Sequence, residues 1–209
     1  MAKNKEKILK AALKLFNEGG LVNVRLQHIA DEAIVSVGNI AYHYTNKGAI
    51  LYALYESLTK KQKQLLAEYR IVPLFDNIDR MIHHTFQLQK EFIFFYKDTL
   101  EIVRAYPSVR KAHQLHISSQ VSQLQVIIDF NVSRGALVKE PMEGVFHQLA
   151  KQVWMTMDFW LTQHAVRVDE TMTEQHYKEA VWNLFIPYFT EMGKREYIQM
   201  LQMPYDFFF

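Results

Sequence analysis

Residues 36–51 read SVGNIAYHYTNKGAIL. This short amphipathic block combines a serine, a glycine, several aromatic or imidazole side chains and a lysine. A helix that only covers a hydrophobic core does not need such a mixture of polar and aromatic side chains. The block therefore predicts a helix with a role at the surface, and the segments on either side of it indicate which role that is.

The apolar spacing before this block predicts two helices. The first covers about residues 5–18, with apolar side chains on one face and lysines on the opposite face, and a pair of glycines ends it. The second covers about residues 26–33. After a tight connection, Ser36 is well placed to cap a third helix that continues to about Tyr44.

Helical spacing continues after the block, and no segment alternates convincingly as a β-strand does. Asn46 can cap a fourth helix that continues towards Arg70. Further helices are expected near residues 76–90, 91–106, 108–134, 142–165 and 172–200. The sequence therefore predicts an all-α protein with a three-helix N-terminal domain over residues 1–46, a linking helix over 47–70 and a larger helical body over 71–209.

Positive charge is concentrated in the first third of the chain. Residues 1–70 contain 11 Lys or Arg and 6 Asp or Glu, whereas residues 71–209 contain 13 and 16. A basic module joined to a mildly acidic body indicates a polyanion as a partner. A lysine-rich solvated face explains the same distribution, so charge by itself does not select between the two interpretations.

The composition also limits the chemistry and the compartment. The sequence contains no cysteine, which excludes disulfides and thiolate sites. The N-terminus has no apolar segment of the signal-peptide type, and no stretch approaches the ~20 apolar residues of a membrane span. We therefore expect a soluble, cytoplasmic protein without a membrane partner.

Two short helices joined by a tight turn form a helix-turn-helix, a motif that places its second helix in the DNA major groove. In such a motif Ile40 holds the third helix against the core, while Gly38 lets the start of that helix approach DNA closely. Lys47 begins the fourth helix, where its charge and the helix dipole both favour an anion. The alternative is a three-helix packing unit whose polar residues are only solvated.

Several positions at fixed spacing resemble the N-terminal domain of the TetR family of bacterial transcriptional regulators. The resemblance covers residues 5–51. It includes a first helix that ends in glycine and an Ile29-Ala30 pair in the second helix. It also includes a block of the form V-S-x-G-x-[LI]-x-x-[HY]-[FY]-x-x-K, which here covers residues 35–47.

Three positions depart from the family pattern. Arg25 stands where a threonine usually caps the second helix, and it can contact a phosphate instead. Ile34 replaces the usual glycine in the turn. Ala41 stands where an aromatic residue is common, and Tyr42 can take over part of that task.

The resemblance implies a ligand-responsive transcriptional repressor that binds a palindromic operator as a homodimer. It also implies a small-molecule effector and no cofactor. Motif alignment places Gln27, Val37 and Asn39 in the groove, where the amides favour adenine and the valine favours the thymine methyl, so A·T-rich half-sites are expected. The residues expected to contact double-stranded DNA are Arg25, Gln27, Ser36, Val37, Gly38, Asn39, Tyr42, His43 and Lys47.

The C-terminal body is also similar to part of the family, because FIFFYKDTLEIVRAYPSVRKAH (residues 92–113) resembles its sixth helix and the start of its seventh in a subset of members. This implies dimerisation through the last two long helices. The expected dimer residues are Phe146, Leu149, Val153, Val181, Leu184, Phe185 and Tyr188. The expected ligand-pocket residues are Phe92, Phe95, Tyr96, Phe130, Trp154, Met157 and Trp160. Core packing is the alternative for each of them.

Other constellations are weaker. Asp158, inside the run WMTMDFW, is compatible with a cationic ligand or with a solvent-facing or helix-end position. His113 and His116 share a helix face, but no third ligand stands at metal-binding spacing, so no metal is expected. Catalytic motifs are missing, so an enzyme is not expected. A rival class is an architectural or protein-interaction module without an effector, which the tail 203–209 (MPYDFFF) mildly favours.

Overall fold

The structure is a computed structural model that describes residues 2–69, 71–167 and 173–202. Within these ranges the backbone forms ten α-helices, one short 3-10 helix and no β-strand. The helices are α1 (Ala2–Asn23), α2 (Leu26–Ala33), α3 (Val37–His43), α4 (Lys47–Tyr69), α5 (Phe75–Glu91), α6 (Ile93–Ala105), α7 (Pro107–Ser133), α8 (Val145–Val166), α9 (Glu174–Phe185), η1 (Ile186–Tyr188) and α10 (Glu191–Gln202). The predicted all-α fold is confirmed.

The chain divides into two compact units. The first unit contains Met1–Gln62 and Leu88–His116, and the second contains Lys63–Gln87 and Ile117–Phe209. The predicted domain boundaries at residues 46 and 70 lie where the sequence pattern changes. The two units instead group the segments that pack together, including segments that are distant in the sequence. Helices α1–α3 share the first unit with α6 because α6 packs directly against α1.

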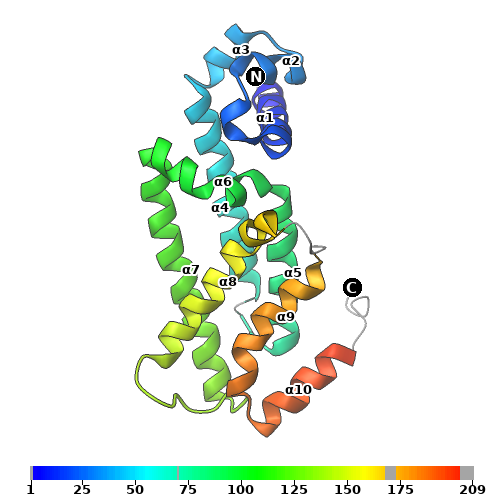
Figure 1. Cartoon of the computed structure of the whole chain (residues 1–209), viewed down its shortest axis with the longest axis vertical. Helices are drawn as coiled ribbons and strands as arrows, with labels where there is room; N and C mark the ends of the chain where they lie inside the picture. The colour runs from blue at the N-terminus through cyan, green and yellow to red at the C-terminus, as the bar shows by residue number, and fades with distance from the viewer. Residues whose placement is uncertain (1, 70, 168–172, 203–209) are drawn as a thin grey trace. The chain divides into compact units, whose positions relative to one another are not determined.

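The first three helices bury one apolar face each around a common core (Figure 1, blue). Ile8 and Phe16 of α1, Ile29 of α2 and Ile40 of α3 are fully buried. Helix α1 continues to Asn23, beyond the predicted end at the glycine pair. Its backbone nevertheless leaves the helical region at Gly20 (φ 74°, ψ 156°), a conformation that glycine adopts at little cost.

Buried polar side chains connect α4, α6 and α7 within the first unit. The Gln62 amide donates to the Tyr96 hydroxyl (2.9 Å), and the Gln62 Oε1 atom lies 2.7 Å from Nε2 of His116. His113 lies 3.3 Å from the Tyr55 hydroxyl, and burial lowers the pKa of its imidazole to about 4. His113 and His116 of α7 therefore take part in polar contacts inside the protein. No cluster of potential metal ligands occurs in the described residues.

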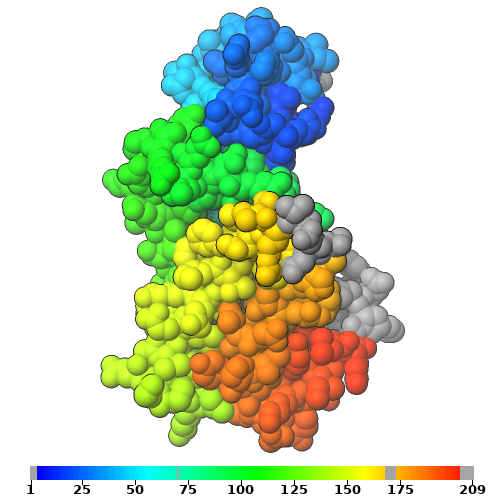
Figure 2. All heavy atoms as spheres, viewed as in Figure 1, coloured from blue at the N-terminus to red at the C-terminus, as the bar shows by residue number. Residues whose placement is uncertain are grey.

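The second unit is built on α8 and α9, which run side by side (Figures 1 and 2, yellow and orange). Asp79 of α5 forms a buried ion pair with Lys178 (2.6 Å) and accepts a hydrogen bond from the Trp182 indole (2.9 Å). Near the end of α7, Arg134 forms a bidentate pair with Glu196 of α10 (2.6 and 2.9 Å). These contacts join α5, α7, α9 and α10 into one body.

The predicted helix over residues 172–200 is wrong in one respect, because it consists of separate elements. Helix α9 ends at Phe185, the short η1 contains Pro187, and α10 begins at Glu191. Proline has no backbone N–H and cannot continue a helix through its own position. The chain then turns so closely that a Cβ atom at Gly193 would lie 2.2 Å from the Ala136 carbonyl oxygen.

Across residues 2–69, 71–167 and 173–202, no helix is long and apolar enough to cross a membrane. The tail 203–209, on which the rival interaction function rests, lies outside the described residues.

Candidate DNA interface

The connection between α2 and α3 is a tight turn. Ile34 adopts a left-handed conformation (φ 55°, ψ 52°), and the Val35 N–H donates to the Ala30 carbonyl (3.0 Å). Ser36 caps α3, because its hydroxyl oxygen accepts from the Asn39 N–H at 3.1 Å. The predicted cap is therefore present, and the chain reverses from α2 into α3 without a flexible linker.

Helix α3 presents a polar and aromatic face on the side opposite its buried Ile40. Ser36, Val37 and Gly38 are exposed, and the Tyr42 side chain is 69% exposed. A Cβ atom added at Gly38 would meet only the Ser36 Oγ atom, at 3.8 Å. Packing within the protein therefore does not require glycine at position 38. Close approach by an outside molecule is a reason for a glycine there.

His43 and Asn39 lie at the edges of this face and are half-buried. The His43 ring packs edge-on against the Tyr42 ring, with centroids 5.0 Å apart. The Asn39 Oδ1 atom accepts a hydrogen bond from Nδ2 of Asn4, in the first turn of α1, at 3.4 Å. The side chain of Asn39 is thus oriented by α1, and its NH2 group remains available to an outside acceptor.

Two further predicted DNA residues lie on α2 or at its start. Arg25 is exposed at the N-cap position, where its backbone N–H donates to Nδ1 of His28 (3.3 Å). This contact is the half of a capping box in which the third helical residue accepts from the N-cap backbone, and Arg25 itself makes no side-chain cap. Gln27 is exposed, and its amide nitrogen donates to Asp31 (2.8 Å) one turn later, which leaves its second N–H and its oxygen available to an outside partner.

Lys47 has a different environment from the one expected. Its Nζ atom donates to the backbone oxygens of Leu21 (2.9 Å), Val22 (3.4 Å) and Val24 (2.9 Å). An ammonium group has three N–H donors, and all three have acceptors at the end of α1. Burial also lowers the pKa of this amine. These contacts give Lys47 a structural role, namely capping α1, while the expected phosphate contact of Lys47 stays a prediction.

Helix α6 contacts the helix-turn-helix through α1. Asn17 accepts from the Phe94 N–H (3.2 Å) and donates to the Glu91 carbonyl (2.8 Å), so it binds the start of α6. The rings of Phe16 and Phe94 pack with centroids 5.4 Å apart. The orientation of α1, and with it that of α3, therefore depends on α6.

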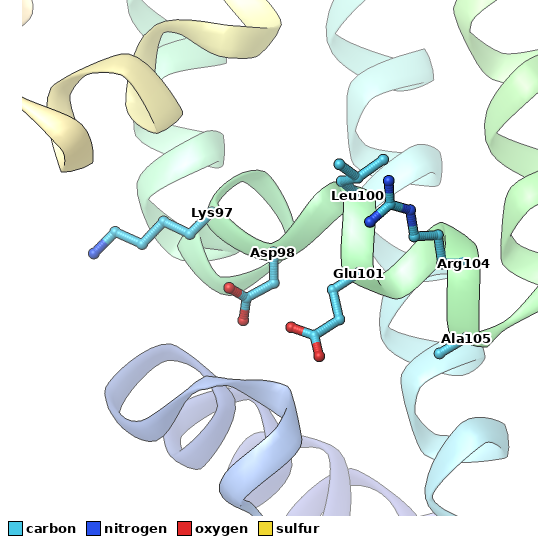
Figure 3. A pocket seen from close by; sticks show the side chains of 6 residues that line it. All are labelled: Lys97, Asp98, Leu100, Glu101, Arg104 and Ala105. Atoms are coloured by element: carbon cyan, nitrogen blue, oxygen red, sulfur yellow. The ribbon is translucent and has the colours of Figure 1, made fainter.

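A second contact joins the two helices where each is irregular. Asp98 interrupts α6 (φ −109°, ψ 15°), and its carboxylate accepts from the Leu21 N–H at 3.5 Å, next to the break at Gly20. Asp98 and Glu101 point towards α1 from an open recess of about 670 Å³ on α6 (Figure 3). The irregular point of α6 is therefore in direct contact with the irregular point of α1.

A capped helix with an exposed polar and aromatic face, joined by a tight turn to a second short helix, is the arrangement of a helix-turn-helix, a DNA-binding motif. Two family models match the chain. One, described as "Bacterial regulatory proteins, tetR family", matches residues 8–54, and the other, described as "Bacterial transcriptional repressor", matches residues 53–197. The second match covers more than half of the chain. The protein therefore belongs to the TetR family, as predicted, and is a DNA-binding transcriptional regulator.

Solved structures share the fold. A TetR-family regulator from Marinobacter aquaeolei VT8 is 22% identical, with a TM-score of 0.80 over 95% of this chain and 97% of that chain. SmeT, the repressor of the Stenotrophomonas maltophilia multidrug efflux pump SmeDEF, is 18% identical, with a TM-score of 0.69 over 90% and 91%. SmeT is also known in a complex with triclosan. At these identities the similarity establishes the fold alone. No curated protein matches the chain significantly.

The residues predicted to line a ligand pocket fall in both units. In the first unit these are Phe92, Phe95 and Tyr96, which are buried, and in the second unit they are Phe130, Trp154, Met157 and Trp160. Of the latter, Met157 is buried and the other three are half-buried. Whether they contact a ligand stays a prediction.

Most residues predicted for the dimer interface lie in the interior of the single chain. The buried ones are Phe146, Leu149, Val153, Val181 and Phe185. A buried side chain cannot contact a second copy in this conformation. Only the half-exposed Leu184 and Tyr188 of the predicted set are therefore accessible.

Four residues that position the interface were not predicted: Asn4, Asn17, His28 and Asp98. His28 stands three residues after the N-cap, where a Glu or Gln usually forms a capping box, so its spacing was a usable signal. The other three act across 35 to 77 residues of chain. No local pattern marks such contacts.

Proposed function

We propose that this TetR-family protein is a repressor that binds a palindromic operator as a homodimer and releases it when a small molecule binds. The observation that supports DNA reading through α3 is the open space at Gly38 beside the exposed Tyr42 side chain. In this account the residues that face the DNA are Arg25, directly before α2, Gln27 of α2, and Ser36, Val37, Gly38, Asn39, Tyr42 and His43 of the α3 segment. Such a regulator acts in the cytoplasm and needs no catalytic group.

The substitution Gly38→Leu tests this assignment. An added Cβ atom at the exposed position 38 meets only the Ser36 Oγ atom, and leucine favours a helix by about 1 kcal/mol over glycine, so the free energy of unfolding should not fall. DNA affinity, measured by fluorescence anisotropy on duplexes enriched from a random pool, should fall at least tenfold. The matched control is Gln64→Leu, at an exposed position of α4. Unchanged DNA affinity of Gly38→Leu would remove α3 from the interface.

The dimer is proposed to form through exposed apolar side chains of α8 and its neighbourhood. Met155 is 51% exposed and Phe159, one turn later on the same face, is 45% exposed. Ile186, directly after α9, is also exposed. Two half-sites read by one dimer require this pairing. Sedimentation velocity should show a dimer at micromolar concentration for the wild type and a monomer for Phe159→Glu; a wild-type monomer contradicts the proposal.

Release is proposed to be a population shift. A ligand that favours a different position of α6 changes the contacts of Asn17 and Asp98, and therefore the orientation of α1 and α3. The existence of an effector can be tested by a thermal-shift screen, because a ligand that binds only the folded state raises the melting temperature. A regulator without an effector shows no such hit and no ligand-dependent release of DNA.

A further inference from the structure

Helix α8 carries a carboxyl group in an unusual position. Asp158 lies in the middle of the run WMTMDFW, far from both ends of the helix. Burial raises the pKa of its carboxyl group to about 7. Its side chain is half-buried rather than sealed, so solvent still reaches it. The predicted alternative of a helix-end carboxylate does not apply.

The charge of Asp158 has no partner within the protein as described. Across residues 2–69, 71–167 and 173–202 it forms no hydrogen bond and no ion pair. Within one turn on either side, α8 contains no lysine or arginine. Lys151 lies on the same flank but seven residues earlier, which is about 10 Å along the helix axis and too far for an ion pair.

A second unsatisfied group stands beside it. Trp154 precedes Asp158 by four residues, so the two side chains are neighbours on the surface of the helix. The indole Nε1 atom of Trp154 is buried without a hydrogen-bond partner, although the residue as a whole is half-buried. Phe159 packs edge-on against the Trp154 ring, with centroids 6.1 Å apart. One flank of α8 therefore carries an unpaired carboxyl group and an aromatic side chain, and the indole N–H of that side chain is buried without a partner.

This combination has a defined chemical preference. A partly buried carboxylate without a partner loses part of its hydration, and a ligand cation offsets that loss. A tryptophan face attracts organic cations through its quadrupole. A neutral ligand of the same shape gains the apolar contact but neither electrostatic contribution.

We propose that the effector carries a positively charged amine or ammonium group, that Asp158 is its counter-ion, and that Trp154 contacts the cation. This inference rests on the proposed function, because it names the chemical class of the effector. The other occupants, a water molecule or a neutral ligand that accepts a hydrogen bond from the protonated carboxyl group, are outcomes of the test below.

The test is isothermal titration calorimetry of the full chain with three permanent cations: benzyltrimethylammonium, tetraphenylphosphonium and ethidium. Neopentylbenzene, the neutral analogue of the first, is the ligand control. We expect at least one cation to bind the wild type saturably and to bind Asp158→Asn at least tenfold more weakly. The control variant Glu143→Gln, which removes an exposed charge just before α8, should bind it within twofold of the wild type.

Three results overturn the inference: no saturable binding of any of the three cations, equal cation affinity in the wild type and Asp158→Asn, or binding of neopentylbenzene as tight as that of benzyltrimethylammonium. The last comparison uses only the wild type, so it holds even if Asp158→Asn does not fold. Binding of selected DNA is measured on the same samples. If DNA binding persists while the cations fail, the cation site is wrong and the DNA-binding function stands; loss of DNA binding by the wild type instead contradicts the proposed function.

Discussion

Replacing Lys47 with methionine removes the ammonium group while keeping most of the aliphatic stem. In the wild type this group donates to three backbone oxygens at the end of α1, two of them at 2.9 Å and one at 3.4 Å. A hydrogen bond that involves a charged group contributes about 1.5–3 kcal/mol to stability. Lys47 is only half-buried, so water can replace part of these contacts in the variant.

We therefore expect Lys47→Met to lower the free energy of unfolding by about 2–3 kcal/mol. For a chain of this size, that corresponds to a fall in melting temperature of roughly 4–12 °C. The assay is urea denaturation followed by circular dichroism. Lys60→Met, at an exposed position in the middle of the same helix, is the control and should lose less than about 0.5 kcal/mol.

The same variant separates capping from phosphate binding. A lysine that neutralises one phosphate contributes about 0.9 to the slope of log K against log salt concentration. If Lys47 caps α1, its replacement leaves this slope unchanged once the protein is folded. A variant of wild-type stability whose salt slope is reduced by about one charge would refute the capping role.

The remaining predictions concern a titrating group, a strained residue and a contact in the interface. Asp158 has a folded-state pKa of about 7 against an ordinary 3.8, so the folded state binds the proton more tightly. The contribution of Asp158 to stability is therefore fully present below pH 4 and is lost as pH rises through 7. Relative to Asp158→Asn, the wild type should lose roughly 2–4 kcal/mol between pH 4 and pH 8 in urea titrations, and parallel profiles contradict this. Ile34→Gly replaces a β-branched residue that has a left-handed backbone conformation and is 87% exposed, so calorimetry should show about 1 kcal/mol of added stability. A loss of stability would contradict this and show that the Ile34 side chain packs. Asn4→Ala frees the Oδ1 atom of Asn39, so binding-site selection should show a stronger preference for adenine at one position, and an unchanged profile excludes the positioning role of Asn4.

The parts of the fold that depend on local chemistry could be predicted from the sequence. Ser36 caps α3 and Asn46 caps α4 as expected, because an N-cap needs only a short polar side chain and the next turn of backbone. Ile40 is buried as the helical period requires. The helix-turn-helix could therefore be predicted from a single stretch of sequence.

The parts that depend on contacts between distant segments could not be predicted. Charge and position at a helix start favoured a phosphate for Lys47, but the carbonyl groups that bind it lie 23 to 26 residues earlier in the chain. Val153 and Phe185 have the apolar character of an interface and of a core alike, and only the packing of α8 on α9 shows that they are buried. The break at Pro187 was marked in the sequence, but the regular spacing around it favoured one helix.

The central claim is that the exposed face of α3 reads DNA. Its most direct test is selection of binding sites from a random duplex pool with the wild type and with Asn39→Ala. The wild type should enrich a palindrome of two half-sites that are A·T-rich where α3 lies, and Asn39→Ala should relax the preference at one base pair by about 1–3 kcal/mol while leaving non-specific affinity nearly intact. The claim is contradicted if the wild type enriches no site, if G·C pairs dominate the α3 positions, or if Asn39→Ala selects the same site with the same preference at every base pair.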